Sequence, residues 1–209
     1  MKSGCPAGGL PRSHPGGPDM TERLITLAAF RPPGRGLELG AGAGKATEYL
    51  KKQGFRMTAL DLEPAGPEVE EGDMRSLLLP EECFDFCLAE CSVSVCGDGD
   101  AALKEAYRVL KKGGVFLLSD VFFRQENAPA LSMKRPLTLA CWQEAFTEAG
   151  FRQEAFRDET AAWKEFFLEC LWNGSAGPES QEFFREAGRA GCGYFLTCLR
   201  KGGRRDGYI

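Results

Sequence analysis

Apolar residues along the chain follow two different spacings. Between residues 36 and 123, short runs of consecutive apolar residues alternate with segments in which apolar residues recur every three or four positions. The runs are typical of strands buried on both faces of a parallel sheet, and the intervening segments are typical of helices with one buried side. The runs that we interpret as strands are 36–39, 55–62, 68–71, 84–93 and 115–123.

The pattern is less regular after Arg124. A helix from about Thr138 is followed by a possible short strand at 151–156. Trp163 begins a segment whose apolar residues are spaced three and four apart, which predicts an amphipathic helix. A last strand is expected at 194–199. The whole pattern indicates the α/β class.

Polar residues predict where two of the helices begin. Asp19, with Glu22 three residues later, has the spacing of a capping box for a helix that stops at Pro32. Asp100 is placed to cap a later helix that ends at Gly113.

The two ends of the chain differ from its middle. Residues 1–19 are rich in Gly and Pro and show no periodicity, so we expect a flexible tail or a lid there. Residues 20–200 are expected to form a single domain, and residues 201–209 a polar tail.

Composition excludes several classes of protein. The 209 residues carry a formal net charge of -4, which argues against general nucleic-acid binding. The chain has no apolar run long enough to span a membrane, and its start has no apolar stretch typical of a signal peptide. Nine cysteines lie scattered through apolar segments, so we expect mostly free thiols in a reducing cytoplasm. A single histidine excludes a three-histidine metal centre, and no metal site is expected.

A glycine-rich turn at 40–44 joins the first strand to the following helix. Glycine lets a ligand approach the backbone, and the helix start offers free N–H groups to it. Asp61 lies 21 residues after Gly40, where an acidic residue can accept hydrogen bonds from ribose hydroxyls. The third glycine comes one place too early for the dinucleotide fingerprint, and Glu38 suits a cationic amino-acid group better than a pyrophosphate. The turn alone is also compatible with a plain packing role.

Four sequence motifs, which follow one another along the chain, together resemble one known enzyme family. The E-x-G-x-G-x-G run at 38–44 resembles the first motif of class I S-adenosylmethionine-dependent methyltransferases. The Gly-Asp-Met run at 72–74 is similar to that family's adenine-binding segment. The run 79–85 is similar to the segment before its fourth strand, and 108–114 to the turn before its fifth, with Lys112 in place of the usual Pro. The resemblance is close over residues 20–123 and weaker to the end of the chain.

The family resemblance implies a Rossmann-like, doubly wound sheet of seven strands, with the last strand antiparallel and helices on both faces. Residues 20–123 would form the cofactor-binding half and residues 124–200 the acceptor side. Glu38 would anchor the amino end of the methionine, and Asp61 would hold the ribose hydroxyls. The implied cofactor-binding residues are Glu38, Gly40, Ala41, Gly42, Gly44, Asp61, Leu62, Asp73, Met74 and Glu90.

Candidates for the transfer site itself are few. Glu90 and Cys91, at the end of the fourth strand, lie where the family lines this site, although a strand end can also simply be solvated. Cys141 points away from the apolar side of its helix and could be an accessible thiol. The surrounding sequence has a faint similarity to arsenite methyltransferases. We nevertheless interpret Cys141 as a surface thiol without a role in the reaction.

The resemblance implies a methyltransferase that acts on a small molecule, with S-adenosylmethionine as its cofactor. The sulfonium methyl group is electrophilic, so in-line positioning of the acceptor would supply most of the catalysis. Two alternatives stay open: a nicotinamide-dependent oxidoreductase, and a non-catalytic protein that binds the cofactor and regulates a partner. No nucleic-acid or membrane partner is expected. The acceptor, any general base and the oligomeric state are not determined by the sequence.

Overall fold

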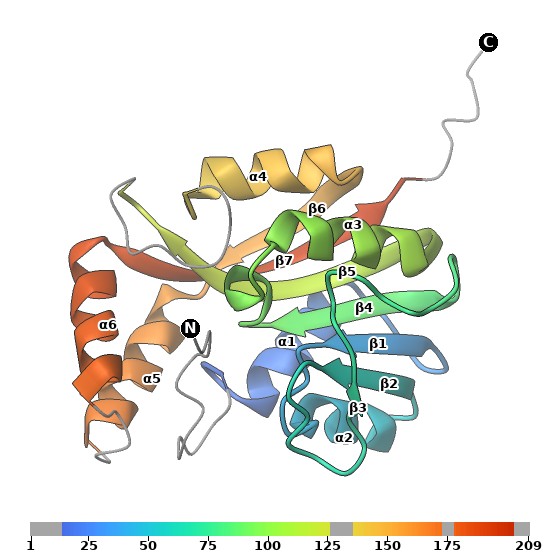
Figure 1. Ribbon diagram of the computed structural model, residues 1–209, viewed down its shortest axis with the longest axis horizontal. Helices are drawn as coiled ribbons and strands as arrows, with labels where there is room; N and C mark the ends of the chain where they lie inside the picture. Colours follow the sequence, from blue (N-terminus) through green and yellow to red (C-terminus); the bar gives the residue numbers. More distant parts are fainter. Residues whose placement is uncertain (1–13, 126–135, 173–177, 203–209) are drawn as a thin grey trace.

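The computed structural model describes residues 14–125, 136–172 and 178–202, and these residues contain a seven-stranded sheet flanked by helices (Figure 1). Neighbouring strands follow the order β3-β2-β1-β4-β5-β7-β6. The strands are β1 (Arg35–Leu39), β2 (Arg56–Asp61), β3 (Glu70–Glu71), β4 (Phe84–Glu90), β5 (Leu110–Phe123), β6 (Phe151–Asp158) and β7 (Cys192–Lys201).

The strand directions agree with the predicted sheet. β1 is parallel to β2 and β4, and β2–β3 and β4–β5 are also parallel pairs. β7 is antiparallel to both of its neighbours, β5 and β6. The doubly wound fold with an antiparallel last strand is therefore confirmed. The strand order reverses between β1 and β4, and ligands of such sheets bind outside the carboxyl ends of the strands at this point.

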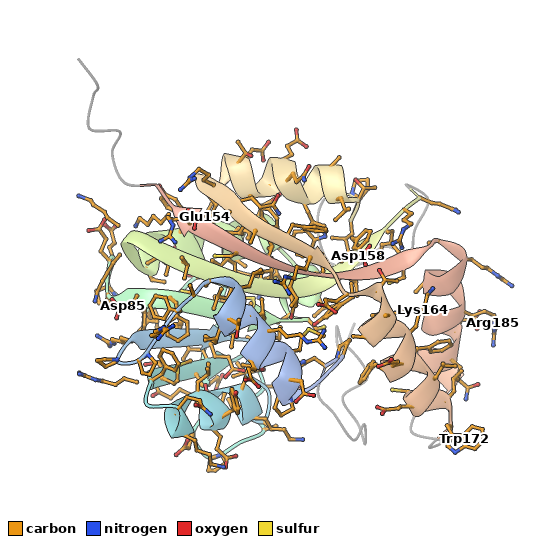
Figure 2. All side chains as sticks on the ribbon, turned by 180° about the vertical axis from the view of Figure 1, so that it is seen from behind. Asp85, Glu154, Asp158, Lys164, Trp172 and Arg185 are labelled. Carbon is orange, nitrogen blue, oxygen red and sulfur yellow. The ribbon has the colours of Figure 1, made fainter. Side chains whose placement is uncertain are left out.

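Helices cover both faces of the sheet. α1 and α2 lie on one face and α3 and α4 on the other, as the two opposite views show (Figures 1 and 2). α5 and α6 stand beside the side of the sheet at which β4 ends (Figure 1). The helices are α1 (Pro18–Leu27), α2 (Lys45–Lys52), the short 3-10 helix η1 (Val93–Val95), α3 (Gly99–Val109), α4 (Leu139–Glu148), α5 (Thr160–Trp172) and α6 (Pro178–Arg189).

The central strands explain the long apolar runs in the sequence. In β4 every residue except Asp85 is buried, and β5 is buried without interruption from Val115 to Asp120. These strands have a helix layer on each face, so both sides of each strand exclude water. Edge strand β3 is reduced to two exposed residues.

The predictions that Asp19 and Asp100 cap their helices were wrong. α1 begins at Pro18, without a side-chain cap, and Asp19 lies inside its first turn. Proline is favoured at the first helical position because its missing N–H would be unpaired there. In α3 the cap is Asp98, which accepts a hydrogen bond from the backbone N–H of Ala101, while Asp100 lies in the first turn. Both acidic residues still lie where the helix dipole favours negative charge.

α6 was not predicted from the sequence. Its segment carries few apolar residues and many charged ones, but the few apolar residues recur at helical spacing on one side. It packs through buried Ala187 next to β7. The amphipathic spacing was therefore present in the sequence, although few apolar residues carry it.

The described part of the chain bears on two expectations from composition. Its eight cysteines are all free thiols. None of its helices has both the length and the apolar character needed to cross a membrane.

Candidate functional site

The glycine turn lies directly beyond β1, at the point where the strand order reverses. The backbone N–H groups of Gly40 and Ala41 both donate to the carbonyl oxygen of Leu60 on β2, which draws the turn toward that strand. Gly40 has φ +73°, and a Cβ placed on it would lie 2.4 Å from Cβ of Ser92. A side chain at this position would therefore collide with the segment that follows β4. Gly44, with φ +75°, forms the left-handed entry into α2.

Glu38 is buried beside this turn. Its Oε2 accepts a hydrogen bond of 2.5 Å from Oγ1 of Thr47 on α2. Burial raises the pKa of Glu38 to about 7, against the opposite effect of the Thr47 hydrogen bond; the nearby Glu90 carboxylate raises it further. A buried carboxylate with a raised pKa stabilises a cation that approaches it.

Asp61 ends β2 on the other side of the turn. Its Oδ2 accepts a 2.7 Å hydrogen bond from the backbone N–H of Gly42, and its Oδ1 accepts one of 2.9 Å from Glu63. A carboxylate can accept about four hydrogen bonds, so acceptor positions are left for a ligand. Leu62, the next residue, is 56% exposed and offers an apolar surface at the same edge.

The Asp73–Met74 segment lies beyond β3. Asp73 forms a two-pronged ion pair with Arg75, whose Nε and Nη2 lie 2.8 and 2.7 Å from its carboxylate oxygens. Hydrogen bonds from Arg75 lower the pKa of Asp73, so this carboxylate is ionised. Met74 is buried, and its terminal methyl lies 3.0 Å from where a Cβ on Gly40 would stand. The structure thus brings Met74 against the glycine turn.

Glu90, the last residue of β4, is buried on the same side of the sheet as Glu38. Glu38 pairs with Leu88 in the parallel register, and Glu90 follows Leu88 by two residues, so both carboxylates point to one face. Oγ1 of Thr21 on α1 lies 3.0 and 3.3 Å from the two Glu90 oxygens. Burial raises the pKa of Glu90 to about 8.

His14 was not among the predicted site residues. Its Nε2 lies 3.6 Å from Oε2 of Glu90, and its ring is buried beneath the segment that enters α1. Thr21 was missed as well. The only signal in the sequence was that the chain has a single histidine, because its Gly- and Pro-rich surroundings predicted either a flexible tail or a lid. Residues 1–13 of that predicted tail lie outside the described residues.

Cys91 follows Glu90 with an unusual backbone conformation. Its φ is +53°, which is uncommon for a residue with a side chain. Its Sγ donates to the hydroxyl oxygen of Tyr194 over 3.4 Å, and the Tyr194 hydroxyl donates to Oγ of Ser119 over 2.8 Å. The Cys91 thiol is therefore hydrogen-bonded to Tyr194 on β7, which is in turn bonded to Ser119 on β5.

Cys141 lies elsewhere. It sits in the first turn of α4, where its backbone N–H donates to Oγ1 of the capping Thr138. α4 packs over β6, at the far end of the strand order from β1. The side chain is half-buried, and the structure does not bring it together with Glu38 and Glu90.

The arrangement as a whole gathers three carboxyl groups at one edge of the sheet, and burial raises the pKa values of Glu38 and Glu90. Asp61 and Glu90 end β2 and β4, and Glu38 is the next-to-last residue of β1 between them, beside a turn whose Gly42 leaves the backbone open. Two of these carboxylates are buried and each is held by a threonine from the covering helices. Such a site suits an elongated ligand with cationic groups at one end and hydroxyls near its middle.

Comparisons with known proteins agree with this geometry. Residues 37–118 match the family described as "Methyltransferase domain". The malonyl-[acyl-carrier protein] O-methyltransferase of Serratia marcescens is 35% identical over 111 residues, which cover 48% of this chain and 44% of that protein. The arsenite methyltransferase of Aquipseudomonas alcaligenes is 36% identical over 69 residues, which cover 33% of this chain and 20% of that protein. The chain thus matches less than half the length of each of these relatives.

A solved structure shows the same fold. The phosphoethanolamine N-methyltransferase 2 of Haemonchus contortus, in complex with S-adenosyl-L-methionine, has a TM-score of 0.73 and 15% identity, covering 95% of this chain and 55% of that one. Together with the family match, this confirms the predicted resemblance to S-adenosylmethionine-dependent methyltransferases.

Proposed function

We propose that this chain, with its methyltransferase domain at residues 37–118, transfers the methyl group of S-adenosylmethionine to a small-molecule acceptor. The observation that carries the proposal is the placement of Glu38 and Asp61. They lie at the carboxyl ends of the adjacent strands β1 and β2, Glu38 next to last and Asp61 last, on either side of the glycine turn, with Glu38 buried and Asp61 partly open.

The residues around the turn fit the parts of S-adenosylmethionine. The buried Glu38 carboxylate provides a partner for the cationic amino end of the methionine. Its raised pKa shows that burial destabilises the unpaired carboxylate, and a bound cation would stabilise it. The spare acceptor positions of Asp61 suit the two ribose hydroxyls. Exposed Leu62 and buried Met74 offer apolar contacts to the adenine, and Asp73 would address its amino group.

The backbone of Gly42 is open, with nothing within 4 Å of where a Cβ would stand, so the cofactor can lie against the chain there; Gly40, Ala41 and Gly44 shape the rest of the turn beneath it. When bound, S-adenosylmethionine supplies an electrophilic methyl group on a sulfonium. The protein has to bind and orient both reactants and to exclude water from the space between them. Glu90 and Cys91 end β4 beside the turn, and we assign them to the wall of this space.

The acceptor is left open between several small-molecule classes. The curated relatives carry different acceptors in their names, and the chain matches only part of each. Transfer by positioning is compatible with all of these acceptors. An arsenite acceptor gains no support from Cys141, which lies over β6 and away from the carboxylates.

Calorimetric titration with S-adenosylmethionine and S-adenosylhomocysteine tests cofactor binding. Asp61→Ala should weaken binding at least tenfold, because each hydrogen bond to a charged group is worth roughly 1.5–3 kcal/mol. Asp85→Ala is the matched control. Asp85 also accepts a backbone hydrogen bond at a strand terminus, but it lies at the amino end of β4, away from the site (Figure 2).

The proposal fails if neither compound binds, or if the two variants weaken binding equally. Tight binding of NADH instead would favour an oxidoreductase. Turnover is measured as release of S-adenosylhomocysteine across hydroxyl, carboxyl, thiol, amine and metalloid acceptors. Cofactor binding without release on any acceptor would favour the regulatory alternative.

A further inference from the structure

We propose that His14 and Glu90 form a proton-holding pair at the transfer site, in which Glu90 takes the proton of the methyl acceptor and His14 positions and tunes Glu90. This inference rests on the proposed function, since it assigns the step that follows or accompanies methyl transfer. It adds to that function a residue from outside the β-sheet, on the segment that leads into α1.

Geometry brings the two side chains together from distant parts of the chain. His14 is 8% exposed, and its Nε2 lies 3.6 Å from Oε2 of Glu90 at the end of β4. A small closing movement would make this a hydrogen bond. Thr21, one turn into α1, donates to the same carboxyl group. The entry into α1 thus covers Glu90 with two side chains, one of which can carry a proton.

The hydrogen-bond partners indicate which nitrogen of His14 holds its proton. Nδ1 lies 3.2 Å from the carbonyl oxygen of Pro15, which can only accept, so we assign the proton of the neutral ring to Nδ1. Nε2 then presents a lone pair toward Glu90. A protonated Glu90 can donate to that lone pair, and an ionised Glu90 favours the imidazolium. The pair can therefore exchange a proton internally.

Charged and titratable groups face the pair from every element around it. Glu38 on β1 favours the protonated form of both partners, whereas Lys45 at the start of α2 disfavours the imidazolium. Cys91 and Tyr194, from the far side, are thiol and hydroxyl groups joined to each other by a hydrogen bond. Burial is the largest influence on both partners: it lowers the pKa of His14 and raises that of Glu90 to about 8. Near neutral pH the pair thus holds its proton chiefly on Glu90.

The proton balance of methyl transfer requires a recipient when the attacking atom bears hydrogen. The bond between the methyl carbon and sulfur breaks, a bond forms between that carbon and the acceptor atom, and the acceptor loses one proton. The electron pair of the broken bond stays on sulfur. Ionised Glu90 receives the acceptor's proton and becomes neutral, and His14 Nε2 accepts a hydrogen bond from it. The proposal therefore selects acceptors whose attacking atom still bears a proton near neutral pH, such as hydroxyl, thiol or ammonium groups, over carboxylates, which are already ionised.

The single histidine of the chain allows a direct test that needs no cofactor. Nitrogen-15 NMR of the imidazole should show a neutral ring with the proton on Nδ1, and a pKa for His14 below 6.5. Its signals should also move in a second step with a midpoint near pH 8, as Glu90 ionises. This second step should disappear in Glu90→Gln and move to higher pH in Thr21→Val, which loses the donor that stabilises the carboxylate.

Glu71→Gln, on the exposed strand β3, is the control and should keep both steps. The pair is refuted if the wild-type ring titrates in one step, or if the second step persists in Glu90→Gln. If Glu90→Gln does not fold, the unmoved midpoint in Thr21→Val refutes the pair equally well.

Kinetics test the catalytic half of the inference, with any acceptor that supports turnover. The kcat/KM value should rise with pH to a plateau, with a midpoint near 8 in the free enzyme. Glu90→Gln should lower kcat about 100-fold and remove the dependence. His14→Asn, whose amide can donate but cannot titrate, should move the midpoint to lower pH and change kcat more than KM.

A midpoint in His14→Asn equal to that of the wild type would leave His14 a purely structural residue and overturn its assigned role. If the NMR steps appear as expected but S-adenosylmethionine does not bind, the proposed function fails while the pair itself stands. If the cofactor binds and turns over but the NMR steps are absent, the pair fails and the proposed function stands.

Discussion

Replacing Glu90 with glutamine should make the stability of the protein depend less on pH. In the folded chain burial raises the pKa of Glu90 from 4.5 to about 8, whereas in the unfolded chain the group is exposed. The folded state therefore holds the proton over a pH range in which the unfolded state has released it. The contribution of protonated Glu90 to the free energy of unfolding is fully present below pH 4.5 and is lost as the pH rises through the folded-state pKa.

The magnitude follows from the two pKa values. Each tenfold difference in proton affinity corresponds to about 1.4 kcal/mol, so the rise from 4.5 to about 8 corresponds to roughly 5 kcal/mol at high pH. Glutamine has nearly the same shape as a protonated glutamate and keeps an oxygen for the hydroxyl of Thr21. The two proteins should therefore be similar in stability at pH 5, and Glu90→Gln should be the more stable by a few kcal/mol at pH 9.

Urea denaturation at constant ionic strength, at one-unit intervals from pH 5 to pH 9, measures this difference. Loss of the Glu90 carboxylate also lowers the pKa of Glu38, which stabilises the variant further at high pH, so this coupling adds to the expected difference with the same sign. Glu71→Gln, an exposed site, should follow the wild type throughout. The reasoning is refuted if the difference between wild type and Glu90→Gln stays constant within about 1 kcal/mol, or if the variant loses stability relative to wild type as pH rises.

Two further predictions concern the glycine turn and the second buried carboxylate. Gly40→Ala should lower the free energy of unfolding by about 2–4 kcal/mol, because the new Cβ would meet Ser92. Gly42→Ala, at a positive φ but in open space, should lower it by only about 1 kcal/mol. Equal losses in urea denaturation would contradict the placement of Ser92. Thr47→Val removes the donor to Glu38 and should lower the free energy of unfolding by about 1–3 kcal/mol at pH 8. The loss should be smaller at pH 5, where Glu38 is protonated. The same loss at both pH values would show that Glu38 does not titrate between them.

The motifs predicted the residues that meet around the glycine turn more completely than those that surround Glu90. Glu38, the glycine turn and Asp61 lie within one strand–turn–helix–strand unit, where local spacing determines which residues meet. Thr47 also belongs to this unit, but a threonine on a helix has no pattern that marks it as the partner of a carboxylate. Asp73 was placed by resemblance, and its ion pair with Arg75 was not visible in the motif.

The partners of Glu90 and Cys91 escaped prediction because they come from distant segments. Glu90 and Thr21 are separated by 69 positions, and Cys91 and Tyr194 by 103. Only the order of strands in the finished sheet brings such residues together. The N-terminal segment shows the same limit: its composition predicted a flexible tail or a lid without naming a partner, and only the structure places His14 beside Glu90.

By itself, the sequence determined the fold class and which residues meet around the glycine turn. Buried strands and amphipathic helices are encoded in the periodicity of apolar residues, and a turn that opens a helix needs glycines at set positions. The tertiary structure alone decided which side chains surround Glu90 and how strongly it holds its proton. The pKa of a carboxyl group depends on how much water the whole fold excludes from it, and exclusion of water is a property of packed layers rather than of neighbouring residues in the chain.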